Sequence, residues 1–183
     1  MGKVSRKGQA AVLSRQDLRR LWAELPNPHR WIAQFSYYTG SRIGEVLALK
    51  SEAIQGDRIL IWQDKVRRSK DLLIAPPLKS VIKQLPIKGG FLFPSSRNPG
   101  RHISRQAFDD MLRNKCDYLG LEGVSSHSFR RSLATHLYRA EYDIRSIMEI
   151  TGHTSLDSFV KYLDLNKDAA DKIIATYFSR RTA

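Results

Sequence analysis

The sequence predicts a mainly α-helical domain that carries one small antiparallel β-sheet, an α+β fold. Apolar residues recur at helical spacing over most of the chain, and Ser14 and Ser104 stand where a helix N-cap is expected. Residues 58–76 differ, because they contain two short β-rich runs on either side of a basic tip, which is typical of a hairpin. The length of 183 residues fits one domain.

Each element is predicted from its own boundary signals. The first helix starts at its Ser14 cap and ends at Pro26, because proline cannot continue a helix. Pro-, Gly- and Ser-rich sequence at residues 86–100 predicts a loop. Residues 1–13 lack periodicity and carry basic residues, so we expect a flexible basic arm there and a single domain over residues 14–183. The expected elements are helices at about 14–25, 29–38 and 42–49, strands at 58–62 and 72–74, and helices at 104–120, 127–140, 143–151, 155–163 and 167–178.

The charge balance points to a polyanionic partner. The chain has 31 Lys and Arg against 18 Asp and Glu, a formal net charge of +13. Basic residues recur along the helical segments and are not gathered in one tail, which favours nucleic acid as the partner. The alternative is a solvated basic surface without a specific partner.

Cysteine content and hydropathy exclude several classes of protein. Cys116 is the single cysteine, so intrachain disulfides and cysteine-rich zinc sites are excluded, and a reducing compartment is expected. The sequence contains neither a run of 18 apolar residues nor a secretory signal. We therefore expect a cytoplasmic, DNA-associated protein with no membrane partner.

Five local patterns follow one another along the chain. They are TGSRIGEVLAL from Thr39, a basic hairpin with Lys65, HSFR from His127, TGH from Thr151, and a tyrosine at 162. Within the first pattern, Arg42 and Glu45 lie three apart on one helix face, where the carboxylate can orient the guanidinium. An exposed ion pair is the alternative for this pattern taken alone.

In this order, the patterns resemble the catalytic domain of the tyrosine recombinases, the phage integrase family, from about residue 13 to residue 178. The organisation is similar to that of the short fimbrial-switch invertases. Tyr162 follows His153 by nine positions, which matches the spacing of the family's nucleophile. The resemblance implies that the remaining catalytic residues bind the phosphate or handle protons; they are Arg42, Arg130, His127 and His153, with Glu45 in support.

The sequence departs from the family's frequent residues at three places. Ser126 replaces a proline, Arg131 replaces a histidine, and Thr151 replaces a leucine. Neither Ser126 nor Arg131 is a catalytic position in the family. Arg131 nevertheless creates an ambiguity, because it neighbours Arg130 in the same motif.

The family's remaining catalytic residue is a lysine on a β-hairpin, which donates a proton to the leaving 5′-oxygen. Lys65, at the end of the first strand, matches this position best, and Lys70 on the same hairpin is the alternative. Nonspecific contact with DNA phosphates is the other role open to both.

The resemblance implies site-specific recombination of double-stranded DNA through a 3′-phosphotyrosyl intermediate. Arginine forks suit a pentacovalent phosphate, and the phosphotyrosyl bond retains the energy for rejoining, so no metal and no nucleotide cofactor are expected. A homo-oligomer on DNA, expected to be a tetramer, follows from the resemblance, with accessory DNA-binding proteins as further partners. A type IB topoisomerase-like nicking and closing enzyme and a non-catalytic DNA-binding protein are the alternatives.

The last expected element is an amphipathic helix within residues 166–181. In the family, a terminal helix often docks on a neighbouring protomer. We therefore expect this segment either to dock on a neighbouring protomer or to pack on its own domain.

Overall fold

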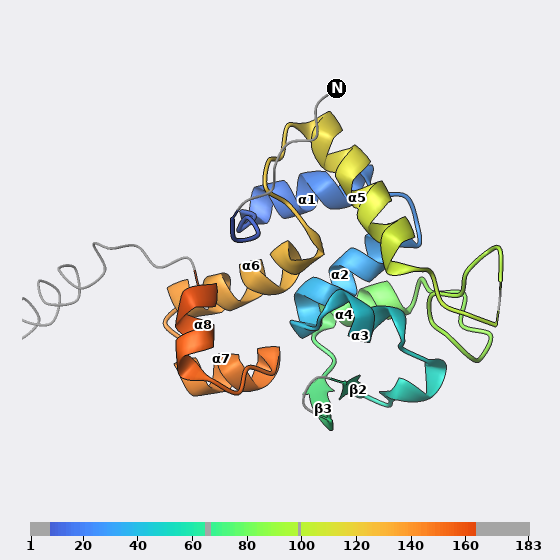
Figure 1. Cartoon of the computed structure of the whole chain (residues 1–183). Helices are drawn as coiled ribbons and strands as arrows, with labels where there is room; N and C mark the ends of the chain where they lie inside the picture. Colours follow the sequence, from blue (N-terminus) through green and yellow to red (C-terminus); the bar gives the residue numbers. More distant parts are fainter. Residues whose placement is uncertain (1–7, 65–66, 99, 164–183) are drawn as a thin grey trace, which may run out of the picture.

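The computed structural model describes residues 8–64, 67–98 and 100–163, and it confirms a mainly helical fold with a small antiparallel sheet (Figure 1). Residues 1–7 of the expected arm and the helix expected within 166–181 lie outside the described residues. Among the described residues, no helix is both long and apolar enough to cross a bilayer. The elements are α1 (Arg15–Glu24), α2 (His29–Thr39), α3 (Ile43–Leu47), η1 (Ser51–Ala53), β1 (Ile54–Gln55), β2 (Arg58–Gln63), β3 (Arg68–Leu73), α4 (Pro76–Ile82), α5 (Arg105–Leu119), α6 (Ser126–Arg139), α7 (Ile144–Thr151) and α8 (Leu156–Tyr162).

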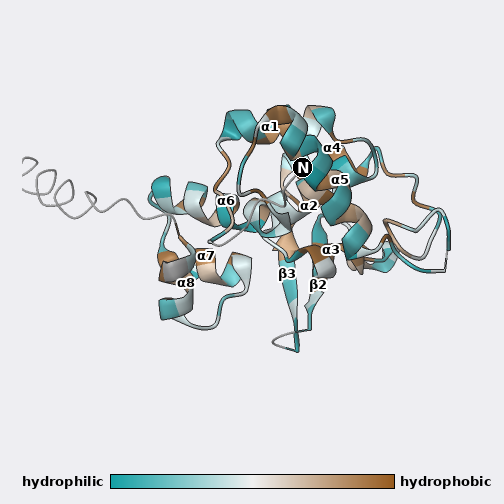
Figure 2. Ribbon diagram, turned by 45° about the horizontal axis from the view of Figure 1, so that its top comes forward, coloured by the Kyte–Doolittle hydropathy of each residue, from teal (hydrophilic) through white to brown (hydrophobic). Residues whose placement is uncertain are grey.

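The sheet has the strand order β1-β2-β3, with both pairs antiparallel. Its β2–β3 hairpin projects from the helices (Figure 2). Ile61 pairs with Lys70, and Gln63 pairs with Arg68, so β3 begins at Arg68 and not near residue 72 as the composition suggested. Strand pairing overrides composition here, because a polar strand residue remains paired wherever the backbone ladder continues.

Helix boundaries follow the expected caps in most cases. The Ser14 and Ser104 hydroxyls accept hydrogen bonds from the backbone N–H groups of Asp17 and Ala107, at 3.0 and 3.1 Å. Helix α4 was missed, although Pro76 at its first position is a good helix start. Its seven residues are too few to show a helical period.

The buried residues form two apolar clusters. The larger one fills the space between α1, α2, α5 and the sheet and contains Phe35, Phe93, Phe108 and Phe129. The smaller one joins α6, α7 and α8 through Ala134, Ile147, Phe159 and Leu163, and Tyr162 packs against it. Helix α8 therefore packs against α6 and α7.

The described part of the expected N-terminal arm lies along the start of α6. Ala11 donates its backbone N–H to the carbonyl of Gly123 at 2.9 Å, and Leu13 donates to the Ser132 hydroxyl at 2.8 Å. We call residues 9–13 the strap.

Candidate active site

Arg42 is the N-cap residue of α3 and is oriented by Glu45. The pairing was predicted, but Arg42 lies ahead of the helix and not on its face as expected. The guanidinium donates to one carboxylate oxygen of Glu45 at 2.8 Å, and the Arg42 backbone N–H donates to the other oxygen at 3.0 Å. The Glu45 side chain is only 5% exposed, whereas that of Arg42 is 26% exposed. The carboxylate is thus fixed inside the domain, and the guanidinium stays accessible.

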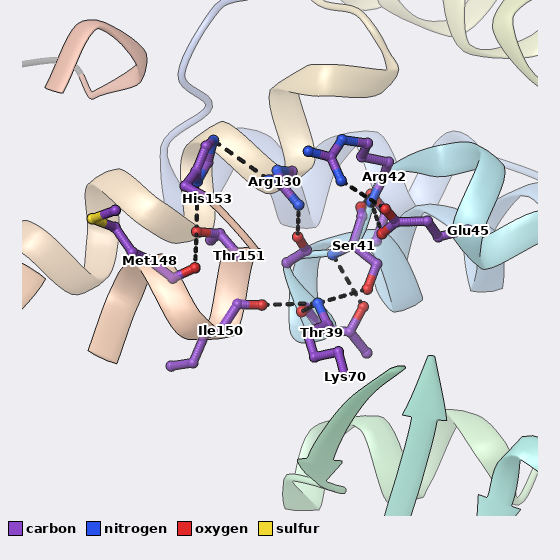
Figure 3. Close-up of polar contacts among 12 residues, drawn as sticks. Thr39, Ser41, Arg42, Glu45, Lys70, Arg130, Met148, Ile150, Thr151 and His153 are labelled. Carbon is purple, nitrogen blue, oxygen red and sulfur yellow. Dashed lines mark hydrogen bonds and ion pairs between the residues drawn. The ribbon is translucent and has the colours of Figure 1, made fainter. Parts of the chain in front are cut away.

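Arg130 lies at the centre of the site, on the first turns of α6 (Figure 3). It is 2% exposed and donates to the carbonyl of Gly40 at 2.9 Å, which places it beside the segment that carries Arg42. Its other terminal nitrogen lies 3.4 Å from Nε2 of His153. Burial lowers the pKa of the Arg130 guanidinium to about 10, so it remains charged at neutral pH.

Thr151 orients the His153 imidazole. The Thr151 hydroxyl donates to the carbonyl of Ile147 at 2.7 Å and lies 2.8 Å from Nδ1 of His153. Because the hydroxyl proton is used on Ile147, this network assigns the imidazole proton to Nδ1. Nε2 is then the acceptor that faces Arg130.

Tyr162 ends α8 next to these groups. Its ring centroid is 4.8 Å from that of His153, and Cζ of Arg130 lies 6.0 Å from the same ring. The phenol donates to the backbone carbonyl of His127 at 3.3 Å. Burial raises the pKa of the phenol above its usual value, and the Arg130 charge opposes this effect. The hydroxyl therefore keeps its proton at neutral pH until a group accepts it.

His127 occupies the first turn of α6 and is partly exposed. Partial burial lowers the pKa of its imidazole, and the charges of Arg105 and Arg130 lower it further. A neutral imidazole at neutral pH is able to accept a proton.

Of the two hairpin lysines, Lys70 is among the described residues. Lys70 is 6% exposed, and its ammonium donates to the carbonyls of Thr39 and Ile150 and to the Ser41 hydroxyl, each at 2.8 to 2.9 Å (Figure 3). All three of its protons are thus used within the protein. Lys65 lies outside the described residues.

Most of the chain matches a known family. The model of the phage integrase family matches residues 11–169. The chain belongs to the phage integrase family. Tyrosine recombinase XerD of Rickettsia bellii is 28% identical over 159 residues, which cover 75% of this chain and 52% of XerD. The integrase of Escherichia phage P2 is 27% identical over 156 residues, which cover 85% of this chain and 43% of that integrase.

This phage integrase family member spans about half the length of the curated relatives it matches. Solved structures share its fold. XerA recombinase superposes with a TM-score of 0.74 at 23% identity, covering 92% of this chain and 64% of XerA. The catalytic domain of bacteriophage HP1 integrase superposes with a TM-score of 0.68 at 21% identity, covering 91% and 95% of the two chains. The predicted family is confirmed, whereas the similarity to fimbrial-switch invertases stays a prediction.

Sequence reasoning missed a buried amide in this phage integrase site. Gln63 is fully buried, and neither of its amide atoms has a hydrogen-bond partner among the described residues. Gly152 lies against it with φ +68°, and a Cβ at this position would come within 2.1 Å of Nε2 of Gln63. The alternation along β2 would have placed Gln63 on the same face as Ile59 and Ile61, but no sequence signal points to its contact with Gly152.

Proposed function

We propose that this chain is the catalytic domain of a site-specific DNA recombinase, which cleaves and rejoins strands through a 3′-phosphotyrosyl bond at Tyr162. One observation carries the proposal. Arg130 contacts the Gly40 carbonyl and His153 and lies beside the Tyr162 ring, so three separate segments meet at one guanidinium. A scissile phosphate at this point would face cationic donors and a tyrosine.

Arg42 and Arg130 would bind the nonbridging oxygens of that phosphate. Their charges are permanent, and the planar fork donates two parallel hydrogen bonds, which suits the equatorial oxygens of a pentacovalent transition state. Glu45 fixes the Arg42 fork before substrate arrives. His153, oriented by Thr151, would donate a further hydrogen bond to the same phosphate group once its Nε2 is protonated.

In the proposed cleavage step, the Tyr162 oxygen bonds to phosphorus and the bond from phosphorus to the 5′-oxygen breaks. The phenolic proton passes to the neutral imidazole of His127, and Lys65 protonates the 5′-oxygen as it leaves. Rejoining reverses these transfers, with a 5′-hydroxyl as the nucleophile. The energy of the phosphodiester is kept in the phosphotyrosyl bond, so rejoining needs no nucleotide, and the two arginines supply the cationic charge that a metal would otherwise provide.

We assign the general acid to Lys65 and not to Lys70. Lys70 is only 6% exposed and its amine faces three protein oxygens, so it can reach a DNA oxygen only by breaking that arrangement. The assignment rests on this exclusion and on the position of Lys65 in the hairpin.

We also propose double-stranded DNA as the partner, with a tetramer as the active assembly, in the cytoplasm. The net charge of +13 supports the DNA partner. Structures of relatives include XerH bound to difH substrate and a lambda integrase dimer bound to a core site.

Covalent capture tests this proposal without a known target. Duplexes with a randomised centre and a nick near the middle are incubated with the protein in excess EDTA, and covalent protein–DNA adducts are isolated in SDS and sequenced. A nick lets the cut strand diffuse away, so the intermediate accumulates. We expect an adduct that enriches one sequence.

Two tyrosine variants provide the controls. Tyr162→Phe should abolish the adduct and keep DNA binding, while Tyr118→Phe, at a tyrosine that is 74% exposed, should form it normally. An adduct that persists in Tyr162→Phe, or that EDTA removes, would contradict the proposal. Strand exchange between two captured duplexes separates a recombinase from a nicking and closing enzyme, and absence of any adduct would indicate a DNA-binding protein.

A further inference from the structure

Arg131 is a second buried arginine in the motif that carries Arg130, and it faces a different part of the molecule. It is 8% exposed and donates Nε to the backbone carbonyl of Tyr162 at 2.7 Å. Its terminal nitrogens donate to the backbone carbonyl of Ala10 and, at 2.6 Å, to Oε1 of Gln9. One guanidinium therefore joins α6, the strap and the residue proposed as the nucleophile.

The contact to Tyr162 completes the end of a helix. Tyr162 is the last residue of α8, where carbonyl groups have no partner within the helix. A cation at this end is favoured by the helix dipole, and Arg131 supplies both the charge and the donor. Its hydrogen bond fixes the main chain from which the phenol projects.

Arg131 also contacts the strap, through Gln9 and Ala10. Its further hydrogen bonds, from Ala11 to Gly123 and from Leu13 to Ser132, hold it beside α6. Gly8, Gln9 and Ala10 line a pocket of about 410 Å³, together with His127, Arg131 and Tyr162. The strap thus forms one wall of the space next to the phenol.

We propose that Arg131 is a positioning residue, which couples the docking of the strap to the placement of Tyr162. The inference deepens the proposed function and rests on it where cleavage is concerned. A planar guanidinium suits three acceptors on different segments, whereas a lysine ammonium at the same position cannot span them. The segment ahead of the domain is in this way connected to the nucleophile through a single side chain.

Hydrogen exchange measured by mass spectrometry tests the coupling without DNA. Arg131→Lys and Gln9→Ala should each speed amide exchange in residues 156–163, while α2 (residues 29–39) stays as in the wild type. Gln55→Ala, at an exposed residue of β1, is the matched control and should change neither region. If Gln9→Ala leaves residues 156–163 unchanged, the strap does not act on α8 and the coupling is wrong.

Single-turnover adduct formation at saturating DNA tests the effect on chemistry. Displacing a reacting group by a fraction of an ångström slows a reaction, and we expect Arg131→Lys to form the adduct about 10-fold more slowly. DNA affinity should remain within a factor of about two, since Arg131 donates its hydrogen bonds to protein oxygens. Adding Gln9→Ala to Arg131→Lys should slow adduct formation little further, because the hydrogen bond between Arg131 and Gln9 is already lost.

The result that would overturn the positioning role is a wild-type adduct rate in Arg131→Lys, or a loss of rate that tracks unfolding in a thermal melt. The failure of the proposed function has a different signature. In that case the wild-type protein forms no adduct at all, and the exchange experiment still decides whether the strap and α8 are coupled.

Discussion

At the scale of single residues, Lys70 connects the last turns of α2 and α7, which lead into the loops that carry Arg42 and His153. Its ammonium donates to Thr39 and Ser41, which directly precede Arg42, and to Ile150, which precedes the Gly152-His153 pair. A protonated lysine has three donors and a neutral amine has two. The protonation state of Lys70 therefore sets how completely the loops are joined.

The first prediction concerns pH. Burial lowers the pKa of Lys70 to about 7, and the charges of Arg130 and Arg42 act in the same direction while Glu45 opposes them. In the unfolded chain the pKa of a lysine is about 10.4, so between about pH 7 and 10 the unfolded state binds more protons than the folded state. The free energy of unfolding should therefore rise with pH in this window, by at most about 1.4 kcal/mol per pH unit for this group.

Urea denaturation of the wild type and of Lys70→Met from pH 6 to pH 9 measures this contribution. The free energy of unfolding of the wild type minus that of Lys70→Met should stay constant below pH 7 and rise above it. Parallel curves across the whole range would mean that Lys70 does not titrate there.

The second prediction separates the general acid from the phosphate ligands. A substrate in which sulfur replaces the leaving 5′-oxygen needs no acid, because thiols have a pKa near 8.5 and leave as thiolates. Lys65→Ala should slow cleavage of ordinary DNA by about 10² to 10⁴ and should cleave the sulfur substrate nearly as fast as the wild type. Arg130→Lys should remain slow on both substrates, because its loss affects the phosphate and not the leaving group.

The comparison is made on the sequence that covalent capture identifies. Rescue of Lys70→Ala by sulfur, with Lys65→Ala unaffected on ordinary DNA, would reverse the assignment of the two lysines.

Some of this residue-level arrangement is visible in the sequence, and some is not. The pairing of Arg42 with Glu45 could be predicted because both partners lie in one short segment, although Arg42 is the N-cap of α3 and not part of its helical face. The Thr151 contact to His153 is similarly local. Lys70 and Gln63 instead meet partners more than 25 positions away, and local patterns carry no information about such contacts.

At the scale of elements, the junction between β2 and α7 depends on one glycine. Gly152 ends α7 with φ +68°, and the buried amide of Gln63 occupies the space where a side chain would be. The hairpin and the loop of His153 are thus packed together without room for a methyl group. This contact places the hairpin next to the site.

The third prediction is that Gly152→Ala destabilises the protein through two separate effects. The left-handed backbone costs about 1 to 2 kcal/mol for a residue with a Cβ. The clash with Gln63 adds to this. Gly56→Ala is the matched control, because Gly56 has φ +63° and nothing within 4 Å of its added Cβ, so it isolates the backbone effect.

Chemical denaturation of both variants gives the loss of unfolding free energy from the backbone conformation and from the clash with Gln63. Gly152→Ala should lose more stability than Gly56→Ala, and combining it with Gln63→Ala should recover the excess. Equal losses in the two glycine variants would show that the Gln63 contact is not tight.

Elements were predicted best where a local signal marks their ends. Ser14 and Ser104 cap α1 and α5 as expected, and the three helices that follow residue 125 lie within a residue or so of their expected bounds. Strand β3 was predicted too short because its first residues, Arg68 to Asp71, are polar. Their strand conformation comes from pairing with β2, which is a tertiary effect.

At the scale of the whole molecule, the small apolar cluster separates the Tyr162 helix from the main core. Helix α8 contacts the domain through α6 and α7, and its last carbonyl through Arg131. The phosphate-binding candidates Arg42 and Arg130 instead belong to segments packed in or beside the larger cluster. Helix α6 contributes Phe129 to the larger cluster and Ala134 to the smaller one, so it links the phosphate site to the packing unit of the nucleophile.

The fourth prediction follows from the charge of the whole chain. With a net charge of +13, DNA binding should release counterions, and the logarithm of the association constant should fall linearly with the logarithm of salt concentration. Fluorescence anisotropy with a duplex at 50 to 300 mM salt gives the slope. A flat response would remove DNA as the main partner.

The central claim is that Tyr162 forms the covalent bond to DNA, and peptide mapping of the captured adduct tests it most directly. Trypsin cleaves after Lys161 and Lys167, which releases the peptide YLDLNK, whose single hydroxyl-bearing side chain is Tyr162. After nuclease digestion, we predict that this peptide carries the added mass of a nucleotide linked through its 3′-phosphate, and that the released DNA end is a 5′-hydroxyl. The same mass on any other peptide, or a 5′-phosphate link, would contradict the account.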